Sequence, residues 1–513
     1  MADHVVVEAD SGKLRGIVEN GISIFKGIPY GGPADGAGRF MPPTKPAPWT
    51  GVRDALAFGA RAMQADEMFA GVPELIKLFS GREEQPMSEN CLFLNVWTPA
   101  TGDAKKRPVM FWCHGGGFFA GSGSSPWYDG TNLSRKGDVV IVTVNHRLGA
   151  FGYLHLGEAG GEASRSSGNA GMLDLVAALR WVRDNIAAFG GDPNNVTIFG
   201  ESGGGAKVSV LMAMPSARGL FHRAIVQSGP GARMASPEDG AETTRALLGA
   251  LGLKADQIDE LRTLPADRLL KAQLTVSAQI GVMSMANRRR LGFNPVVDGI
   301  ALPTHPFDPV APDISADVPL MIGTNLHETT LFFAFFPWFD KLDEADLRKR
   351  VALIMGDSAD RIIEIYRRGQ PNMTPKDLFI AITTDRMMRG PSLTTADRKI
   401  AQHAAPAYVY LFTYETPVLG GKLKSPHALE IPFVFDNLAI APLAGDNPGR
   451  LLLGDKMSRA WIAFARSGNP NHNGLPQWPA YSIAQRPTMM FEDKCHVVND
   501  PFGDGRQAME GSV

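Results

Sequence analysis

The chain has 513 residues, of which 44% are hydrophobic and 20% are charged, a composition that is ordinary for a folded globular protein. Its formal net charge is −2, and no basic stripe points to nucleic acid as a partner. The N-terminus lacks the basic start and apolar stretch of a signal peptide, and no run of about 18 apolar residues predicts a membrane span. We therefore expect a cytoplasmic protein with no nucleic-acid partner and no membrane span.

Short β-rich runs separated by glycine or asparagine open the chain and predict antiparallel strands within residues 5–30. The proline-rich stretch 31–48 is interpreted as an ordered surface loop, because strand signals continue on both sides of it. Nearly continuous apolar runs follow, which suit strands buried on both faces, as in a parallel sheet. These runs cover residues 109–113, 139–144, 196–199, 224–228, 318–322 and 408–413.

Helical patterns lie between several of these runs, most clearly at 170–189 and 206–214. Alternation of strand and helix predicts an α/β fold with a mostly parallel central sheet, covered by helices and preceded by antiparallel N-terminal strands. Two helix-rich segments, about 236–290 and 340–403, fit the alternation poorly. We interpret them as helical excursions over the carboxyl edge of the sheet, where α/β folds bind ligands, within one domain spanning 1–513.

A serine flanked by glycines, Gly200-Glu201-Ser202-Gly203-Gly204, follows an apolar run and precedes a helical pattern. This is the strand–turn–helix setting of the Gly-x-Ser-x-Gly nucleophile motif. The sharp turn strains the serine backbone, glycines remove Cβ clashes, and the hydroxyl lies at a helix N-terminus that favours developing negative charge. The alternative is a glycine-rich turn with an incidental serine. We predict that Ser202 is the nucleophile of a serine hydrolase with the α/β-hydrolase fold.

A second glycine run, His114-Gly115-Gly116-Gly117-Phe118, follows the apolar strand 109–113. Acyl transfer builds an oxyanion, and backbone N–H donors can point at it where no side chains intervene. We assign this oxyanion hole to the N–H groups of Gly116, Gly117 and Gly203. A plain glycine loop or a phosphate cradle is the alternative, but the run lacks both nucleotide-binding glycine patterns.

The remaining triad members are expected downstream, because α/β-hydrolases place serine, acid and histidine in that order. His427 lies in a turn-rich loop after the last apolar run, as a base should. His327 ranks second, since it adjoins the candidate acid. That acid is Glu328, which follows the VPLMI strand closely and can orient an imidazole there. Asp298 is the alternative acid, although its position also suits an ordinary turn residue.

Blocks spread along nearly the whole chain match those of one known family. They are FKGIPYGGP, GRFMPP, SENCLFLNVWTP, WCHGGGFFAGSG, VNHRLGAFGYL, GNAGMLDLVAALRWVRDNIAAFGGDPNNVTIFGESGGGAKV, FHRAIVQSG and GNPN. The chain resembles the type-B carboxylesterases, which include bacterial para-nitrobenzyl esterases and the cholinesterases. The resemblance implies Ser202, Glu328 and His427 as the triad, because GTNLHE and SPHALEIPFVF match the family's acid and histidine motifs. It also implies that no cofactor and no metal is needed.

The resemblance assigns supporting roles to Glu201, beside the nucleophile, and to Ser228, which would buttress the triad from behind. For Ser228 a plain strand-end serine remains an equal alternative. The family often pairs the cysteine of SENCL with an earlier one, but that position is Met63 here, so Cys91 lacks the partner. The segment 64–90 contains no tryptophan of the kind that binds choline in cholinesterases, which argues against a choline ester as substrate.

The apolar segment after the candidate acid, LFFAFFPWF, begins three residues beyond Glu328. Rigid aromatic rings suit an apolar pocket, so we expect Leu331, Phe332 and Phe333, together with Phe118, to line the substrate site. Core packing beneath a helix is the alternative for each ring, and a pocket mouth exposed to lipid is a third interpretation.

These residues predict a hydrolase for small-molecule carboxylic esters with an apolar acyl or alcohol group. An enzyme cleaving amides or carbamates with the same triad is one alternative. A non-catalytic binding relative is another, and an intact set of catalytic residues argues against it.

Overall fold

The computed structural model describes residues 3–65, 72–79, 85–287 and 291–510. The chain divides into two compact units. The first comprises Met1–Met68, Gly81–Ala224 and Gly231–Ser315, and the second comprises Phe69–Ser80, Ile225–Pro230 and Ala316–Val513. A single domain over the whole chain therefore stays a prediction.

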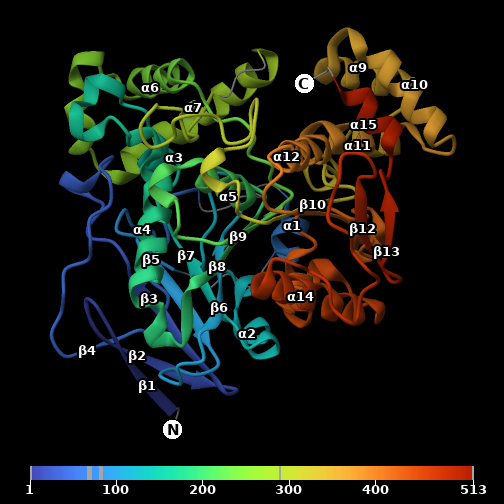
Figure 1. Ribbon diagram of the computed structural model, residues 1–513. Coiled ribbons are helices and arrows are strands. Elements are labelled where there is room, and N and C mark those ends of the chain that lie inside the picture. Colours follow the sequence, from blue (N-terminus) through green and yellow to red (C-terminus); the bar gives the residue numbers. More distant parts are fainter. Residues whose placement is uncertain (1–2, 66–71, 80–84, 288–290, 511–513) are drawn as a thin grey trace. The chain divides into compact units, whose positions relative to one another are not determined.

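The N-terminal strands of the first unit form an antiparallel ladder, as the sequence predicts (Figure 1). The strand β1 (Asp3–Ala9) pairs with β2 (Gly12–Glu19), β2 with β3 (Ile22–Pro29), and β3 with β5 (Phe93–Thr98). The short strand β4 (Val52–Asp54) runs parallel to β2. Alternating burial along β1 and β2 shows that this end of the sheet has one face in the core and one toward solvent.

Parallel strands carry the sheet of the first unit toward the two glycine motifs. β7 (Val140–Val144) is antiparallel to β5, while β6 (Arg107–Cys113) runs parallel to both β7 and β8 (Gly191–Glu201). Every residue of β6 and β7 is buried, as expected for strands covered on both faces. Cys113 at the end of β6 pairs with Gly200 near the end of β8, so both glycine segments begin at the same edge.

Six α-helices belong to the described part of the first unit: α2 (Thr131–Gly137), α3 (Gly149–Tyr153), α4 (Ala170–Asn185), α5 (Gly203–Ala213), α6 (Pro237–Leu251) and α7 (Ala266–Asn287). The buried pair of Arg147 and Asp174 ties the segment after β7 to α4 through two bonds of 2.6 and 2.8 Å. Helices α6 and α7 fall in the predicted excursion 236–290 and lie side by side (Figure 1).

The second unit has its own run of neighbouring strands. β9 (Arg223–Gln227) enters this unit at Ile225 and lies next to β10 (Leu320–Asn325) in the strand order. β11 (Ala407–Phe412) runs parallel to β10, and β12 (Pro487–Phe491) runs parallel to β11. β13 (His496–Asn499) closes the run in the antiparallel direction. The predicted sheet, mostly parallel with antiparallel N-terminal strands, is confirmed.

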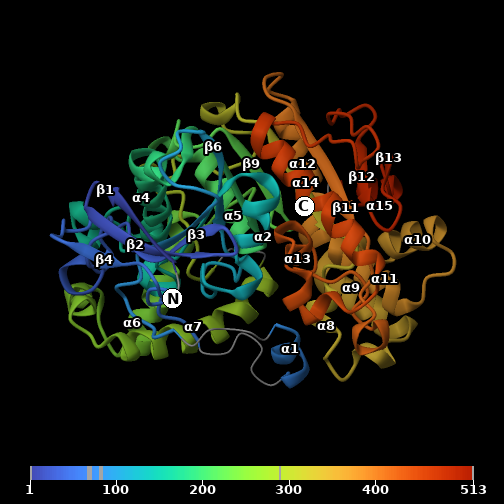
Figure 2. The ribbon, with the colours of Figure 1, turned by 90° about the horizontal axis from the view of Figure 1, so that it is seen from below.

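The helices described in the second unit are α1 (Pro73–Leu78), α8 (Thr330–Phe333), α9 (Glu344–Met355), α10 (Ala359–Gly369), α11 (Pro375–Thr384), α12 (Gly390–Ile400), α13 (Ile431–Phe435), α14 (Gly449–Ser467) and α15 (Gly503–Met509). Helices α9 to α12 occupy the predicted excursion 340–403, and α9, α10 and α11 pack on one another (Figure 2). Across the ranges that the structure describes, no helix has the length and apolar character needed to cross a membrane.

Candidate active site

The serine predicted as nucleophile occupies the turn between β8 and α5. Ser202 is partly exposed and has φ 57° and ψ −124°, a backbone conformation that non-glycine residues rarely adopt. The turn is tight: a Cβ on Gly204 would lie 2.0 Å from the carbonyl oxygen of Cys113, and one on Gly200 would lie 2.6 Å from it. Glycine is therefore required at both positions, and the turn presents the serine hydroxyl at the N-terminus of α5.

The two glycine segments meet beside this serine. A Cβ on Gly203 would lie 2.5 Å from the backbone nitrogen of Gly117, so these two residues are in backbone contact. Gly116 and Gly117 have φ of 85° and 60°, values that favour glycine. A Cβ on Gly115 would lie 3.0 Å from Oε2 of Glu201. The structure thus brings the segments carrying all three predicted oxyanion donors together within the first unit.

The predicted acid and base pair with each other within the second unit. His427 Nδ1 lies 2.6 Å from Glu328 Oε2, and Glu328 Oε1 accepts a 2.7 Å bond from the backbone N–H of Asn325. Glu328 is fully buried and His427 is 5% exposed. The backbone N–H of His427 also donates to the carbonyl of Glu328. Both carboxylate oxygens are thereby occupied, which holds the carboxylate against one ring nitrogen.

The alternative base and acid are not paired with each other or with the predicted triad. His327 Nδ1 is 3.9 Å from a carboxylate oxygen of Glu415, too far for a hydrogen bond, and burial lowers the pKa of His327 to about 3. Asp298 accepts bonds of 2.9 and 3.0 Å from the backbone N–H groups of residues 300 and 302, and one of 3.0 Å from Asn169. Asp298 therefore has the turn role that its sequence context also suggested.

A buried polar network behind the acid was missed by the sequence analysis. Asn325 Nδ2 donates to Glu430 Oε2 at 2.7 Å, and Gln227 Nε2 donates to Glu430 Oε1 at 3.1 Å. The indole N–H of Trp461 donates to Gln227 at 3.0 Å. Burial raises the pKa of Glu430, and the nearby Glu328 carboxylate raises it further. The only sequence signal was a glutamate three residues after the histidine, in SPHALEIPF.

The two residues expected to support the triad are both buried. Glu201 is 3% exposed at the end of β8. Ser228 is fully buried with φ 49°, and its backbone N–H donates to Gly323 on β10 at 2.8 Å. The side-chain oxygen of Ser228 makes no hydrogen bond within the described residues. Their supporting roles stay predictions.

Two phenylalanines follow the glycine run 115–117, and the more exposed of them is not the one predicted to line the substrate site. Phe118 is 7% exposed and packs against Tyr153, with ring centroids 5.1 Å apart. Phe119 is 56% exposed, and its ring lies against Gly117, within 2.5 Å of where a Cβ would be. Phe119 is therefore the exposed ring that lies beside a glycine predicted to belong to the oxyanion hole.

The aromatic segment after Glu328 divides into exposed and packed members. Phe332 is 38% exposed, and its ring centroid is 5.1 Å from that of His427. Phe333 packs edge-on against Phe379 at 5.2 Å, and Leu331 is buried. Phe332 alone among these three combines exposure with contact to a predicted catalytic ring.

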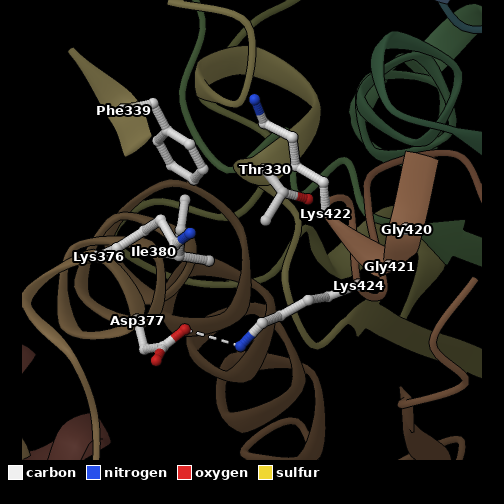
Figure 3. Close-up of a pocket in the computed structure, with 9 residues that line it drawn as sticks. All are labelled: Thr330, Phe339, Lys376, Asp377, Ile380, Gly420, Gly421, Lys422 and Lys424. Atoms are coloured by element: carbon white, nitrogen blue, oxygen red, sulfur yellow. Dashed lines mark hydrogen bonds and ion pairs between the residues drawn. The ribbon is translucent and has the colours of Figure 1, made fainter. Parts of the chain in front are cut away.

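A small cavity of about 230 Å³ lies in the second unit (Figure 3). Two of its lining residues are close in sequence to the predicted pair: Thr330 follows Glu328 by two residues, and Lys424 precedes His427 by three. Its lysines are already paired: Lys424 with Asp377 at 2.7 Å, and Lys422 and Lys376 with Asp340 at 2.6 and 3.6 Å. None of the predicted site residues lines it. The lining consists of Thr330, Phe339, Lys376, Asp377, Ile380, Gly420, Gly421, Lys422 and Lys424.

The strained serine between strand and helix, the adjoining glycine backbones and the buried carboxylate–imidazole pair together define an α/β-hydrolase. Comparison with known proteins gives the family. Residues 3–504 match the carboxylesterase family. The para-nitrobenzyl esterase of Bacillus subtilis (strain 168) is 38% identical over 99% of this chain and 98% of its own length. The phenmedipham hydrolase of Pseudarthrobacter oxydans is 34% identical over 96% of each chain.

Solved structures agree with the sequence relatives. A Geobacillus stearothermophilus carboxylesterase superposes with a TM-score of 0.84 at 43% identity, covering 98% of this chain and 99% of that one. A para-nitrobenzyl esterase superposes with a TM-score of 0.85 at 36% identity, covering 99% of each chain. This chain belongs to the type-B carboxylesterase family and is an ester hydrolase, so the resemblance and the fold predicted from its sequence are confirmed.

Proposed function

We propose that this carboxylesterase cleaves small-molecule esters through an acyl-enzyme on Ser202, with His427 as base and then acid, and Glu328 as the residue that orients it. The observation that carries the proposal is the buried 2.6 Å contact between His427 Nδ1 and Glu328 Oε2. A carboxylate on Nδ1 keeps the proton on that nitrogen, which leaves Nε2 able to accept one. It also stabilises the imidazolium that forms during the reaction.

The reaction follows from these roles. His427 Nε2 accepts the hydroxyl proton while the oxygen of Ser202 attacks the ester carbonyl, and the N–H groups of Gly116, Gly117 and Gly203 stabilise the oxyanion. The intermediate collapses, and His427 gives its proton to the departing alcohol. A water molecule, deprotonated by His427, then attacks the acyl-enzyme. The second intermediate collapses, His427 returns the proton to the oxygen of Ser202, and the carboxylic acid is released.

Apolar groups on the acyl or alcohol side suit the rings displayed near these residues. Phe332 lies beside His427 in the second unit, and Phe119 lies beside Gly117 in the first. Both rings are substantially exposed, so each can contribute apolar contact area to a bound substrate. Phe118, Leu331 and Phe333, which were predicted to line the site, are more deeply packed.

Amides and carbamates are the second substrate class, since acyl-enzyme chemistry can serve them as well. One relative is named phenmedipham hydrolase, which makes a broad substrate panel worthwhile. Initial rates on matched nitrophenyl acyl esters, anilides and carbamates separate the classes. We expect the highest kcat/KM on esters, and a higher kcat/KM on anilides or carbamates would reassign the preferred substrate.

The nucleophile is tested by covalent labelling. A fluorophosphonate probe should add one adduct, on Ser202, and Ser202→Ala should lose both the adduct and about 10⁴-fold or more of the turnover. The melting temperature should stay close to that of the parent, because the serine side chain is small and partly exposed. Labelling or turnover that survives Ser202→Ala would exclude this serine as the nucleophile.

A further inference from the structure

A buried lysine lies directly behind the predicted oxyanion hole, and the mechanism above does not use it. Lys207 is on α5, five residues after Ser202, and its side chain is fully buried. Its Nζ donates a 2.8 Å hydrogen bond to the carbonyl oxygen of His114 and lies 5.7 Å from the ring centroid of Phe118. A helical side chain leans toward the helix N-terminus, which explains how the ammonium group reaches back under the glycine loop.

This placement is energetically costly. Burying an ammonium group without solvent costs several kcal/mol unless its partners compensate. Burial lowers the pKa of Lys207 to about 7, while Cys113 and the Glu201 carboxylate oppose that shift. The neighbouring rings of His114 and His146 stack at 5.0 Å, and burial lowers the pKa of both, which favours their neutral forms. These rings therefore neither repel the ammonium group nor compensate its charge. An apolar residue would fill this position at lower cost.

The hydrogen bond joins the two segments that carry the oxyanion donors. The His114 carbonyl immediately precedes Gly115, Gly116 and Gly117, while Lys207 extends from the helix whose first residue is Gly203. Glycines with positive φ are free to adopt other backbone conformations. A bond from α5 to the start of the loop restricts that freedom and fixes the loop relative to the helix.

The charge of Lys207 acts in the same place. Oε2 of Glu201 lies within 3.0 Å of where a Cβ of Gly115 would be, so a negative charge lies beside the loop. A carboxylate there repels a developing oxyanion, and this repulsion is weakly screened because Glu201 and Lys207 are both buried. The ammonium group of Lys207 offsets it.

We propose that Lys207 is a positioning residue for the oxyanion hole, which clamps the loop 114–117 to α5 and offsets the charge of Glu201. This inference rests on the proposed function. A residue acting in this way matters more in the transition state than in substrate binding, because the oxyanion exists only after attack. Its loss should therefore lower kcat and leave KM nearly unchanged.

The test compares Lys207→Met with a matched control, Lys399→Met. Lys399 is also buried, at 1% exposure, and also donates a 2.8 Å bond to a backbone carbonyl, that of Ala316, but it belongs to α12 of the second unit and has no bond to the glycine loop. Both variants remove a buried ammonium group of similar shape. Melting temperature, kcat, KM and the affinity for an alkyl trifluoromethyl ketone, whose serine adduct carries an oxyanion, are measured for each.

We expect Lys207→Met to lower kcat by about 10- to 100-fold, less than removal of a direct oxyanion donor, with KM within about threefold. Ketone affinity should fall by the same factor as kcat/KM, because both report stabilisation of an oxyanion. Lys399→Met should leave all three constants unchanged. A folded Lys207→Met protein with parental kcat and ketone affinity overturns the proposal.

Two further outcomes are separable. If Ser202→Ala keeps its turnover, the proposed function fails, whereas failure of the Lys207 inference leaves the fluorophosphonate adduct on Ser202 intact. If Lys207→Met does not fold, Lys207→Gln takes its place, because its shorter, uncharged side chain removes both the charge and the reach to the His114 carbonyl. We expect its kcat and ketone affinity to fall together, as for Lys207→Met. A folded Lys207→Gln protein with parental kcat and ketone affinity overturns the proposal.

Discussion

Replacing the buried carboxylate of Glu328 by an amide tests the proposed catalytic role of the Glu328–His427 pair most directly. In Glu328→Gln the amide oxygen can still accept from the backbone N–H of Asn325, now 2.7 Å from Oε1. The NH₂ group then faces Nδ1 of His427, which must become an acceptor, so the ring proton moves to Nε2. In that tautomer Nε2 cannot take a proton from the nucleophile.

The expected loss is large for turnover and small for stability. We expect kcat to fall by about 10³- to 10⁴-fold, or about 4–5.5 kcal/mol of transition-state stabilisation, with KM nearly constant. The lost charge-assisted hydrogen bond costs about 1.5–3 kcal/mol of folding free energy, partly offset because a charge is no longer buried.

The assay is steady-state hydrolysis of a nitrophenyl acyl ester, with thermal unfolding measured in parallel. Glu430→Gln is the matched control: it changes the neighbouring buried carboxyl, whose partners are Asn325 and Gln227. We expect this control to retain kcat within about tenfold, because Glu430 is bonded to amides and not to the imidazole. A Glu328→Gln enzyme whose kcat is as high as that of Glu430→Gln would refute the assigned role.

Three other perturbations follow from the packing. Phe332→Ala should shift the preferred acyl chain length with little change in melting temperature, whereas Phe333→Ala should cost about 3–5 kcal/mol and leave the acyl profile alone, as a substrate panel with calorimetry would show. Gly204→Ala should disrupt folding or activity, because its Cβ would lie 2.0 Å from the Cys113 carbonyl oxygen. Gly249→Ala is the matched control, because this glycine is exposed on α6 with open space around it, and the change should raise the free energy of unfolding by about 0.5–1 kcal/mol. All three cysteines are buried and unbridged, and burial raises each thiol pKa. A thiol reagent should therefore find three free thiols in the protein denatured without reductant, and fewer in the folded protein. A count of one would contradict both the reduced state and the expected cytoplasmic location.

Local rules were enough to predict the elements that carry the proposed catalytic groups. The apolar runs at 109–113 and 196–199 became β6 and β8, since strands buried on both faces need continuous apolar sequence. Ser202 was predictable because the sharp turn that holds it requires glycines on both sides, and these are present in the sequence. The pairing of Glu328 with His427 was predictable because each follows a strand at the same edge of a sheet.

Contacts between distant segments could not be predicted in the same way. Glu430 looks like an ordinary helix-flanking glutamate in the sequence, and only the fold brings Asn325 and Gln227 to it. Phe118 and Phe119 are chemically identical neighbours, and the backbone turn alone decides which ring is buried. Lys207 would normally be assigned to a solvated helix face, and only the fold buries it and brings its ammonium group to the His114 carbonyl.

The donors assigned to the oxyanion hole are main-chain amides of glycine, so no side-chain substitution can delete them. A Cβ at position 117 or 203 would already lie within 2.5 Å of neighbouring atoms. Any substitution found in a saturation mutagenesis scan would therefore lower activity through steric clash, whether or not the N–H donor matters. Such a scan cannot tell a lost donor from a displaced loop. Amide-to-ester exchange in the backbone, introduced by semisynthesis or by α-hydroxy acid incorporation, removes one N–H while keeping the shape. This exchange therefore measures the contribution of each N–H donor without adding a side chain.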